Sequence, residues 1–350
     1  MNIALLTIWR EKNYGAELQA YATVKLLQRL GHYVKMIDIR LSDSRKGNFN
    51  KKIYNLLCGL TPGHRKFENF WKKNIPVTRR YRSIEELQNN PPKADIYMVG
   101  SDQVWNPDLT GKFSLLYFLN FGSESVRRVS FASSFGSPIW KYPELKDNVQ
   151  QLLNRFCHIT CREKSGVLLL KNEFNMIACN VVDPTLILYD YSDFVMGVTE
   201  NQSLVYYPLY SDSELEIFSK RLSDELGIKF INNGARRYIL GRVEWDRTGI
   251  EEWVRNIAGA RFVITRSFHG LLFSLMFHRS FAIIASKDGR NSRITDFLSL
   301  IGLSNRFFDS VEDLYSSKIW NDEIDYVKID EKLSELREAS FNELKRELDL

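Results

Sequence analysis

A histidine at the start of a predicted helix is the residue of this chain that is best placed to do chemistry. His269 lies in the polar turn Arg266–Gly270, between the apolar run Phe262–Ile264 and the apolar stretch Leu271–Phe277, and a further apolar run, Phe281–Ala285, follows. This order predicts a parallel strand–helix–strand unit. Ligands of open parallel sheets bind beyond the carboxyl ends of the strands, and a helix N-terminus favours an anion. The turn therefore predicts an anion site beside a side chain that can carry a proton.

An aspartate that follows another predicted strand is the second candidate. Asp102 comes after the apolar run Asp95–Val99 and after Gly100 and Ser101. Because glycine has no Cβ, the backbone there can approach a ligand closely. We expect Asp102 to accept a proton from a hydroxyl group, and the alternative is that it caps the turn beginning at Val104.

Polar turns also follow the other predicted strands of the N-terminal half, and parallel strands end at one edge of a sheet. Asn13 and Gly15 either present a helix N-terminus to phosphate or sugar or simply cap that helix. Ser134 and Gly136 either line a ligand cleft or form a plain loop. The remaining candidates for substrate contacts in these turns are Ser101, Gln103 and Asn106, together with Trp105, which either stacks on a sugar ring or belongs to the core.

Two arginines are candidates for binding an anionic substrate, because the guanidinium group donates in bidentate geometry. Arg162 follows the predicted strand His158–Cys161, and its alternative role is a salt bridge with Glu163. Arg293 precedes the predicted helix Ile294–Leu300, and its alternative is an ordinary surface position.

Alternating strands and helices predict an α/β protein with two domains, residues 1–195 and 196–350. The cycle restarts after about residue 195 with the apolar run Ser203–Tyr207. The last segment, Leu333–Leu348, is an amphipathic helix that packs back on a domain or forms a dimer coil.

The segment of residues 41–82 interrupts this cycle and is strongly basic. Between Arg40 and Arg82 twelve Lys and Arg residues stand against Asp43 and Glu68, a balance of +10 in a chain whose net charge is +5. Interleaved aromatic residues suit an anionic membrane surface, an anionic acceptor or a nucleic-acid groove. The alternative is a solvated insertion, and the mild overall charge does not favour nucleic acid.

Composition sets further limits. The 350 residues, 44% of them hydrophobic, can bury a large core, and no apolar run predicts a signal peptide or a membrane span, so we expect a cytoplasmic protein. Four cysteines suggest no disulfide framework. Around His158, residues 157, 159 and 161 would share one face of a strand, which favours a buried row over a metal site. We expect no metal.

Three motifs, in the same order along the chain, resemble the polysaccharide pyruvyl transferase family. They are Asn13-Tyr14-Gly15-Ala16, Gly100-Ser101-Asp102-Gln103-Val104-Trp105-Asn106 and Ser267-Phe268-His269-Gly270. Shorter supporting motifs are Ser134-Phe135-Gly136, Arg162-Glu163 and Asp183-Pro184.

The resemblance implies a glycosyltransferase-B-like fold, in which two Rossmann-like domains face a central cleft. It also implies transfer of the enolpyruvyl unit of phosphoenolpyruvate, without a cofactor, to two hydroxyls of a sugar in a bacterial surface glycan. On this basis His269, Asp102 and Arg162 are predicted to be catalytic, with Arg266, Ser267, Gly270 and Arg293 among the substrate contacts. Many family members carry an arginine where this chain has Ser267, so either Arg266 or Arg162 supplies that charge.

The resemblance leaves two alternative functions and a choice of acceptors. A sugar-nucleotide-dependent glycosyltransferase could share the fold, and so could a non-catalytic glycan-binding protein. The expected partners are phosphoenolpyruvate and a sugar acceptor, with a lipid-linked oligosaccharide at the inner membrane face as one form of it.

Overall fold

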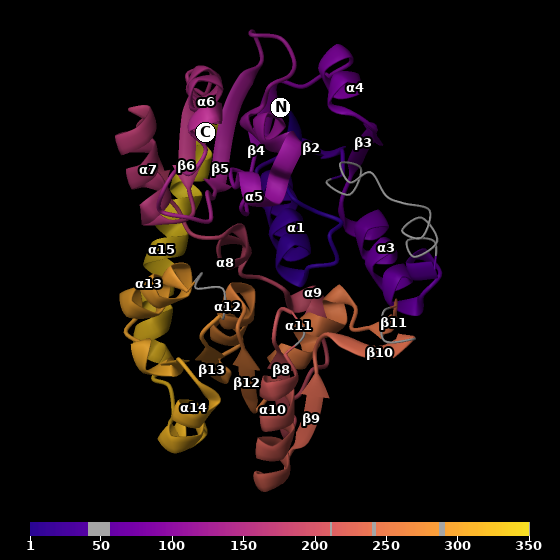
Figure 1. Cartoon of the computed structure of the whole chain (residues 1–350), viewed down its shortest axis with the longest axis vertical. Helices are drawn as coiled ribbons and strands as arrows, with labels where there is room; N and C mark the ends of the chain where they lie inside the picture. The colour runs from indigo at the N-terminus through magenta and orange to yellow at the C-terminus, as the bar shows by residue number, and fades with distance from the viewer. Residues whose placement is uncertain (41–56, 211, 240–242, 287–290, 350) are drawn as a thin grey trace. The chain divides into compact units, whose positions relative to one another are not determined.

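The computed structural model describes residues 1–40, 57–210, 212–239, 243–286 and 291–349. The chain divides into two compact units (Figure 1). Unit 1 consists of Met1–Lys46, Lys72–Leu188 and Glu335–Leu350, and unit 2 of Gly47–Trp71 and Tyr189–Ser334.

Unit 1 is built on a parallel sheet of seven strands in the order β3-β2-β1-β4-β5-β6-β7. From β1 the chain adds strands in one direction, and from β4 it adds them in the other. The turns that follow β1 and β4 therefore flank the topological switch point, where ligands bind in such sheets. The strands are β1 (Asn2–Leu6), β2 (Tyr33–Asp38), β3 (Val77–Arg80), β4 (Ile96–Val99), β5 (Arg127–Ser133), β6 (His158–Cys161) and β7 (Cys179–Asn180).

Helices cover both faces of this sheet because its strands are apolar on both sides. The helix α1 (Tyr14–Arg29) begins at the capping residue Asn13 and packs against α8 (Pro184–Leu188). The other helices of unit 1 are α4 (Ile84–Asn89), α5 (Pro107–Thr110), α6 (Lys146–Leu153) and α7 (Lys164–Phe174), with 3-10 turns over Gly111–Phe118 and Pro143–Leu145.

Unit 2 repeats the plan with a parallel sheet of five strands in the order β14-β13-β12-β8-β9. Its switch point lies between β8 and β12. The strands are β8 (Ser203–Tyr207), β9 (Lys229–Asn232), β12 (Phe262–Thr265), β13 (Ser280–Ile284) and β14 (Phe307–Phe308), and an antiparallel pair is formed by β10 (Ala235–Ile239) and β11 (Val243–Arg247).

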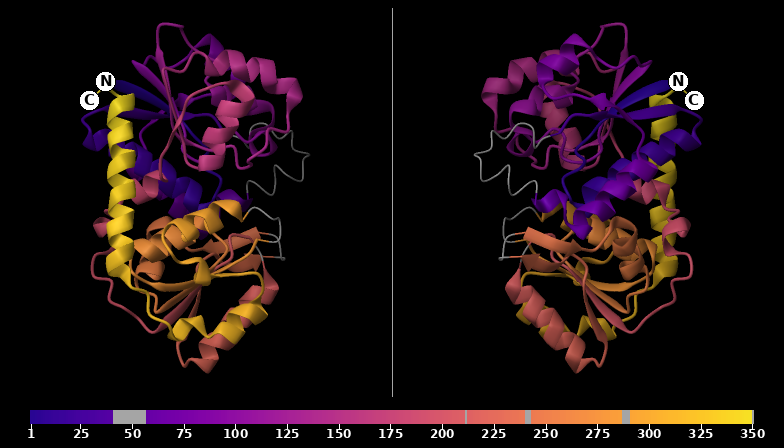
Figure 2. Two further views of the ribbon diagram at one scale, coloured as in Figure 1. Left: turned by 90° about the vertical axis from the view of Figure 1, so that its left-hand side faces the viewer. Right: turned by 90° about the vertical axis from the view of Figure 1, so that its right-hand side faces the viewer.

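Two helix layers enclose the sheet of unit 2 (Figure 2). On one face α10 (Ser213–Glu225) and α14 (Val311–Ser317) contribute Leu215, Phe218 and Leu314 to a core with alternate strand residues. The opposite face is covered by α11 (Ile250–Ala258) and α12 (Phe268–Met276). The remaining helices are α9 (Ser192–Val195) and α13 (Ser292–Leu300), with 3-10 turns over Ser304–Arg306 and Ile319–Asn321.

Two helices contribute residues to both units, namely α3 (Pro62–Asn74) and α15 (Tyr326–Glu347). The second half of α15 lies beside the strands of unit 1 (Figures 1 and 2). There the Oγ of Ser340 accepts a hydrogen bond from the backbone N–H of Val182 at 3.0 Å.

The predicted α/β class with two Rossmann-like sheets is confirmed. Three details differ from expectation. The helix α12 begins at Phe268 instead of Leu271, so His269 lies inside its first turn. The strand pair β10–β11 was not predicted, and the basic segment of residues 41–82 contains β3, an edge strand of the unit 1 sheet. Residues 41–56 of that segment lie outside the described residues. No helix within the described ranges is long and apolar enough to span a bilayer.

Candidate functional site

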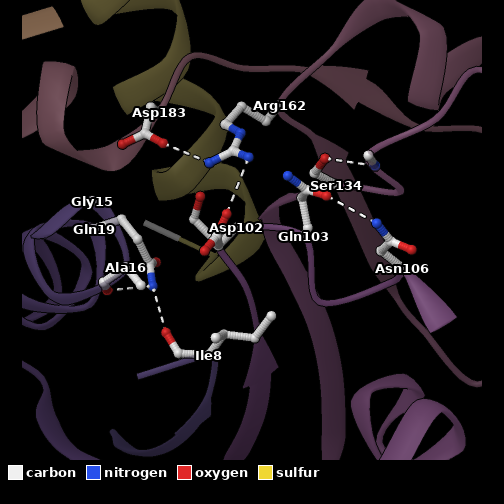
Figure 3. Close-up of polar contacts among 12 residues, drawn as sticks. Ile8, Gly15, Ala16, Gln19, Asp102, Gln103, Asn106, Ser134, Arg162 and Asp183 are labelled. Atoms are coloured by element: carbon white, nitrogen blue, oxygen red, sulfur yellow. Dashed lines mark hydrogen bonds and ion pairs between the residues drawn. The ribbon is translucent and has the colours of Figure 1, made fainter. Parts of the chain in front are cut away.

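Three carboxylates converge on one arginine at the carboxyl edge of the unit 1 sheet, and Figure 3 shows Asp102 and Asp183 beside it. The Nη1 of Arg162 donates to Asp183 at 2.8 Å, Nη2 to Asp102 at 3.3 Å, and Nε to Glu163 at 3.3 Å. The side chain of Arg162 is 1% exposed and that of Asp183 is fully buried, whereas Asp102 keeps 18% of its side chain exposed. Arg162 thus joins the ends of β4, β6 and β7.

The electrostatic balance at Arg162 favours its charged form. Burial alone would lower the pKa of the guanidinium, but Glu163, Asp183 and Asp102 outweigh burial, and the pKa is raised. The predicted salt bridge with Glu163 is therefore present as part of a larger cluster. Because three carboxylates already engage Nε, Nη1 and Nη2, the arrangement suits holding Asp102 in place better than receiving a further anion.

The backbone holds Asp102 at the switch point. Its φ is +71°, its carbonyl oxygen accepts hydrogen bonds from the N–H groups of Val104 and Ser134, and the preceding Gly100–Ser101 peptide is cis. A Cβ on Gly100, whose φ is +109°, would lie 2.1 Å from a backbone oxygen of β5, so this turn requires glycine. The alternative role expected for Asp102 was to cap the turn that begins at Val104. The backbone carbonyl oxygen of Asp102 accepts the hydrogen bond from the N–H of Val104, and its carboxylate faces Arg162 instead.

A second polar network adjoins this cluster. The Oγ of Ser134 donates to Glu163 at 2.8 Å and accepts from the N–H of Gly136 at 3.0 Å, and the Nδ2 of Asn106 donates to the Oε1 of Gln103 at 2.9 Å. A Cβ on Gly136 would lie 2.2 Å from that same Oε1. The turns after β4 and β5 therefore pack closely, and four predicted residues come together.

The turn after β1 is joined to the turn after β4 by residues that the sequence analysis did not select. The Nε2 of Gln19 donates to the carbonyl oxygens of Ile8 and Ala16, and also to the Oγ1 of Thr7, which itself donates to the carbonyl oxygen of Ser101 at 2.8 Å. The polar residues Glu17, Gln19 and Thr23 in a helix that is buried along most of its length are the signal that could have indicated this link.

Asn13 acts as the N-cap of α1. Its Oδ1 accepts from the N–H of Gly15 at 3.0 Å and of Ala16 at 3.4 Å. The simple capping role is therefore occupied, and a ligand at this helix would meet the exposed face of Asn13 instead of those two N–H groups.

The prediction that Trp105 stacks on a sugar is wrong. Its side chain is fully buried, lies flat against Phe118 at a centroid distance of 5.3 Å and donates from Nε1 to the carbonyl oxygen of Tyr117. The 3-10 turn over Gly111–Phe118 supplies the aromatic ring and the carbonyl oxygen that Trp105 contacts. Trp105 therefore fixes the turn that carries Asp102 to the hydrophobic core.

In unit 2 the first turn of α12 carries the predicted histidine. His269 is 8% exposed, and Ser267 is the N-cap of α12, with its Oγ accepting from the N–H of Gly270 at 3.3 Å. A Cβ on Gly270 would lie 2.6 Å from the Oγ1 of Thr265, so this glycine serves packing between β12 and α12. The residues predicted around His269 thus position the helix start.

Arg266 is engaged by an aspartate that the sequence analysis did not select. Its Nε and Nη2 lie 2.9 and 2.8 Å from the Oδ2 of Asp212, and Nη1 donates to the carbonyl oxygen of Ala285. Both charged side chains are 4% exposed. Asp212 follows β8, so this pair joins the two central strands of unit 2 across their switch point.

Arg293 lies near His269 through a shared aromatic neighbour. Its guanidinium stands over the ring of Phe268 at 5.1 Å, and the same ring meets His269 edge-on at 5.9 Å. Arg293 is partly exposed. The predicted residues thus form two sets, one at the carboxyl edge of each sheet.

Comparison with solved structures supports the fold. The chain is similar to S. aureus MnaA solved with UDP, with 12% identity, 100% of this chain and 97% of that chain covered, and a TM-score of 0.52. It is also similar to UDP-N-acetylglucosamine 2-epimerase from Rickettsia bellii, with 8% identity, 99% and 98% covered, and a TM-score of 0.50. A third similar structure is Glycyrrhiza uralensis UGT73P12 complexed with glycyrrhetinic acid 3-O-monoglucuronide, with 10% identity, 99% and 95% covered, and a TM-score of 0.50. At these identities the likeness concerns the glycosyltransferase-B-like fold alone.

The family assignment comes from the sequence. No curated protein matches the chain. The sequence profile of polysaccharide pyruvyl transferases matches residues 13–288, well over half of the chain, and includes both the Asp102 turn and the first turn of α12. The chain therefore belongs to the polysaccharide pyruvyl transferase family.

Proposed function

We propose that this protein transfers the enolpyruvyl unit of phosphoenolpyruvate to two hydroxyls of one sugar in a bacterial capsule, exopolysaccharide or cell-wall polymer. The product is a cyclic pyruvate ketal, and phosphate is released. The observation that carries the proposal is the Asp102 carboxylate, held by buried Arg162 at the switch point of the unit 1 sheet, within the residues that match the family.

The reaction sets clear demands on the protein. A proton is added to the methylene carbon of phosphoenolpyruvate, which becomes a methyl group, and positive character develops on the neighbouring carbon. One sugar hydroxyl attacks that carbon, the bond from that carbon to the phosphate oxygen breaks, and the second hydroxyl closes the ring. The two hydroxyl protons balance the proton placed on the methyl group and the one that leaves with phosphate. The reaction therefore needs a general acid and a general base.

Asp102 is suited to be the base. One of its oxygens faces Arg162, and its side chain remains partly exposed at the end of β4. Arg162 then acts as a positioning residue, because its nitrogens fix the carboxylate and do not need to reach the substrate. Three carboxylates around one guanidinium also favour an uncharged ligand here, so we assign the sugar acceptor to unit 1.

His269 is suited to be the acid or to hydrogen-bond the leaving phosphate. It lies in the first turn of α12, where the helix dipole favours a negative group. The partly exposed Arg293 contacts the ring of Phe268, which also contacts His269. We assign Arg293 to binding the anionic groups of the donor. Arg266 is instead committed to Asp212 and serves as a positioning residue.

The acceptor's form is part of the same proposal. The basic segment includes the exposed Lys72 and Lys73 at the end of α3. Such charges suit a diphosphate-linked lipid acceptor or the anionic inner face of the plasma membrane. Charge reversal at these two lysines should weaken binding to anionic vesicles while phosphate release with a soluble acceptor stays unchanged.

The test measures phosphate release from phosphoenolpyruvate with candidate acceptor glycans, together with acid-labile pyruvate on the product. We expect His269→Ala and Asp102→Asn each to lower the turnover number by about 10²–10⁴-fold. Matched controls are His278→Ala, which removes a partly exposed histidine paired with Asp330, and Asp147→Asn on the surface of α6. Turnover in both site variants within tenfold of wild type would refute the assignment.

The same assay separates the alternative functions. Release of a nucleoside diphosphate from a sugar nucleotide, with no use of phosphoenolpyruvate, would indicate a glycosyltransferase. Glycan binding with neither reaction would indicate a non-catalytic protein.

A further inference from the structure

A histidine, a cysteine and a glutamate meet on the side of unit 1 where α15 covers the sheet. They are His158 at the start of β6, Cys179 in β7 and Glu343 in α15, and one ligand atom of each lies within 4.8 Å of the other two. All three side chains are partly buried. They belong to the same unit, and none of the three is among the predicted site residues.

The polar atoms of this cluster mainly face one another. The Nε2 of His158 and the Oε2 of Glu343 are each buried and form no hydrogen bond of good geometry within the described residues, although they lie only 3.3 Å apart. The other carboxylate oxygen of Glu343, Oε1, pairs with Arg346. Two buried atoms with lone pairs therefore face each other at close range.

The spacing fits a small divalent cation. With bonds of about 2.0–2.1 Å to nitrogen and oxygen, two ligands of a tetrahedral zinc ion lie ~3.4 Å apart, and a thiolate sulfur at ~2.3 Å lies ~3.6 Å from either. The 3.3 Å between His158 and Glu343 matches the first value. Cys179 needs only a small side-chain movement to meet the second.

The chemistry of the donors selects the metal. Imidazole and thiolate are ligands of zinc, whereas magnesium and calcium prefer oxygen alone. Three protein ligands leave a fourth position for water. One turn further along α15, Glu347 is fully buried, with the hydroxyl of Thr160 as a neighbour of its carboxyl group.

We propose that His158, Cys179 and Glu343 bind one zinc ion, which fastens α15 to the β6–β7 edge of the unit 1 sheet. The site is structural and separate from the proposed pyruvyl transfer. Binding releases the thiol proton of Cys179 and joins α15 to the neighbouring strands β6 and β7. The ion therefore stabilises the folded chain in proportion to how tightly it binds.

The test uses the full chain, stripped with a chelator and titrated with Co²⁺ as a spectroscopic substitute for zinc. We expect one equivalent to bind with a thiolate-to-cobalt charge-transfer absorption, and Zn²⁺ to displace it. Cys179→Ser should abolish that absorption, and Glu343→Gln should weaken binding at least tenfold. The matched controls are Cys157→Ser, the exposed thiol next to His158, and Cys58→Ser, and both should bind as wild type does.

Several results would overturn the proposal. They are the absence of a thiolate absorption in the wild-type protein, its survival in Cys179→Ser, and its loss in Cys157→Ser. Thermal unfolding gives an independent readout, because added Zn²⁺ should raise the melting temperature of the wild type and leave Cys179→Ser unchanged. A zinc-dependent rise of equal size in both proteins would also contradict the site.

Discussion

Replacing Arg162 by methionine is predicted to destabilise unit 1 strongly, although the arginine lies at a candidate ligand edge. The substitution removes a guanidinium that pairs with Asp183, Asp102 and Glu163 at once. Asp183 is fully buried, and its other oxygen accepts hydrogen bonds from the N–H and the hydroxyl of Thr185, neither of which carries a positive charge. The energetic cost therefore lies mainly in leaving a carboxylate without its cation.

The size of the loss in the free energy of unfolding follows from how deeply the ion pairs are buried. Removing one partner of a buried ion pair costs about 3–5 kcal/mol, whereas an exposed pair contributes about 0–1 kcal/mol. Lys146→Met is the matched control, because Lys146 pairs with Glu173 at 2.9 Å with both side chains at least 40% exposed. Arg162→Lys keeps the charge but has one nitrogen where arginine uses three, so we expect an intermediate loss of about 2–3 kcal/mol.

Urea unfolding followed by tryptophan fluorescence measures these differences. With a slope of about 2 kcal/mol per molar urea, Arg162→Met should lower the midpoint of the unit 1 transition by about 2 M and Lys146→Met by less than about 0.5 M. Adding Asp183→Asn to Arg162→Met should recover part of the loss, because it removes the uncompensated charge.

Equal midpoints for Arg162→Met and Lys146→Met would refute this reasoning. So would a double variant that is no more stable than Arg162→Met, since the loss could then not come from the charge of Asp183.

Three further predictions concern buried or constrained positions. Burial, together with the neighbouring Glu343, raises the pKa of Glu347 well above its ordinary value, so the folded chain keeps a proton that the unfolded chain releases. The contribution of this carboxyl group to the free energy of unfolding is therefore lost as the pH rises above about 4.5. In the presence of a chelator, the stability that Glu347→Gln gains over wild type should be larger at pH 7.5 than at pH 4.5. Equal gains at the two pH values would contradict this. Gly100→Ala should lower the free energy of unfolding by about 3 kcal/mol, because the added Cβ meets fixed backbone. Gly136→Ala should lower it by about 1 kcal/mol, because only flexible side-chain ends must move. Urea midpoints in the reverse order would contradict the argument. Burial raises the pKa of the Cys161 thiol, which makes that thiol unreactive in the folded protein. At pH 8, mass spectrometry should find iodoacetamide on the exposed Cys157 of the native protein, and on Cys161 only after the protein is unfolded.

The strand–helix alternation and the polar strand ends were accessible from the sequence because both are local patterns. Short apolar runs predicted β4, β8 and β12, and the turns after β4 and β12 carry candidate residues. The start of α12 was misplaced because Phe268 and His269 read as part of a polar turn, while the capping hydroxyl of Ser267 places them in the helix.

The partners of the charged residues were not accessible in the same way. Arg266 pairs with Asp212, and Arg162 with Asp183 and Asp102, over separations of 54, 21 and 60 residues. Such pairs depend on which strands are neighbours in the sheet, and the periodicity of apolar residues along the chain does not indicate the order of the strands. Trp105 was misjudged for the same reason, since the aromatic ring that covers it belongs to a later turn.

The composition of unit 1 has a consequence for the order in which the chain folds during synthesis. Residues 335–350 belong to this unit, together with the first 46 residues, whereas unit 2 is complete at Ser334. The first-made strands must therefore wait for the end of α15, while unit 2 can fold earlier on the ribosome. A chain released before Glu335 would leave the β6–β7 edge uncovered, so it should be retained by chaperones or degraded even though its candidate catalytic residues are all present.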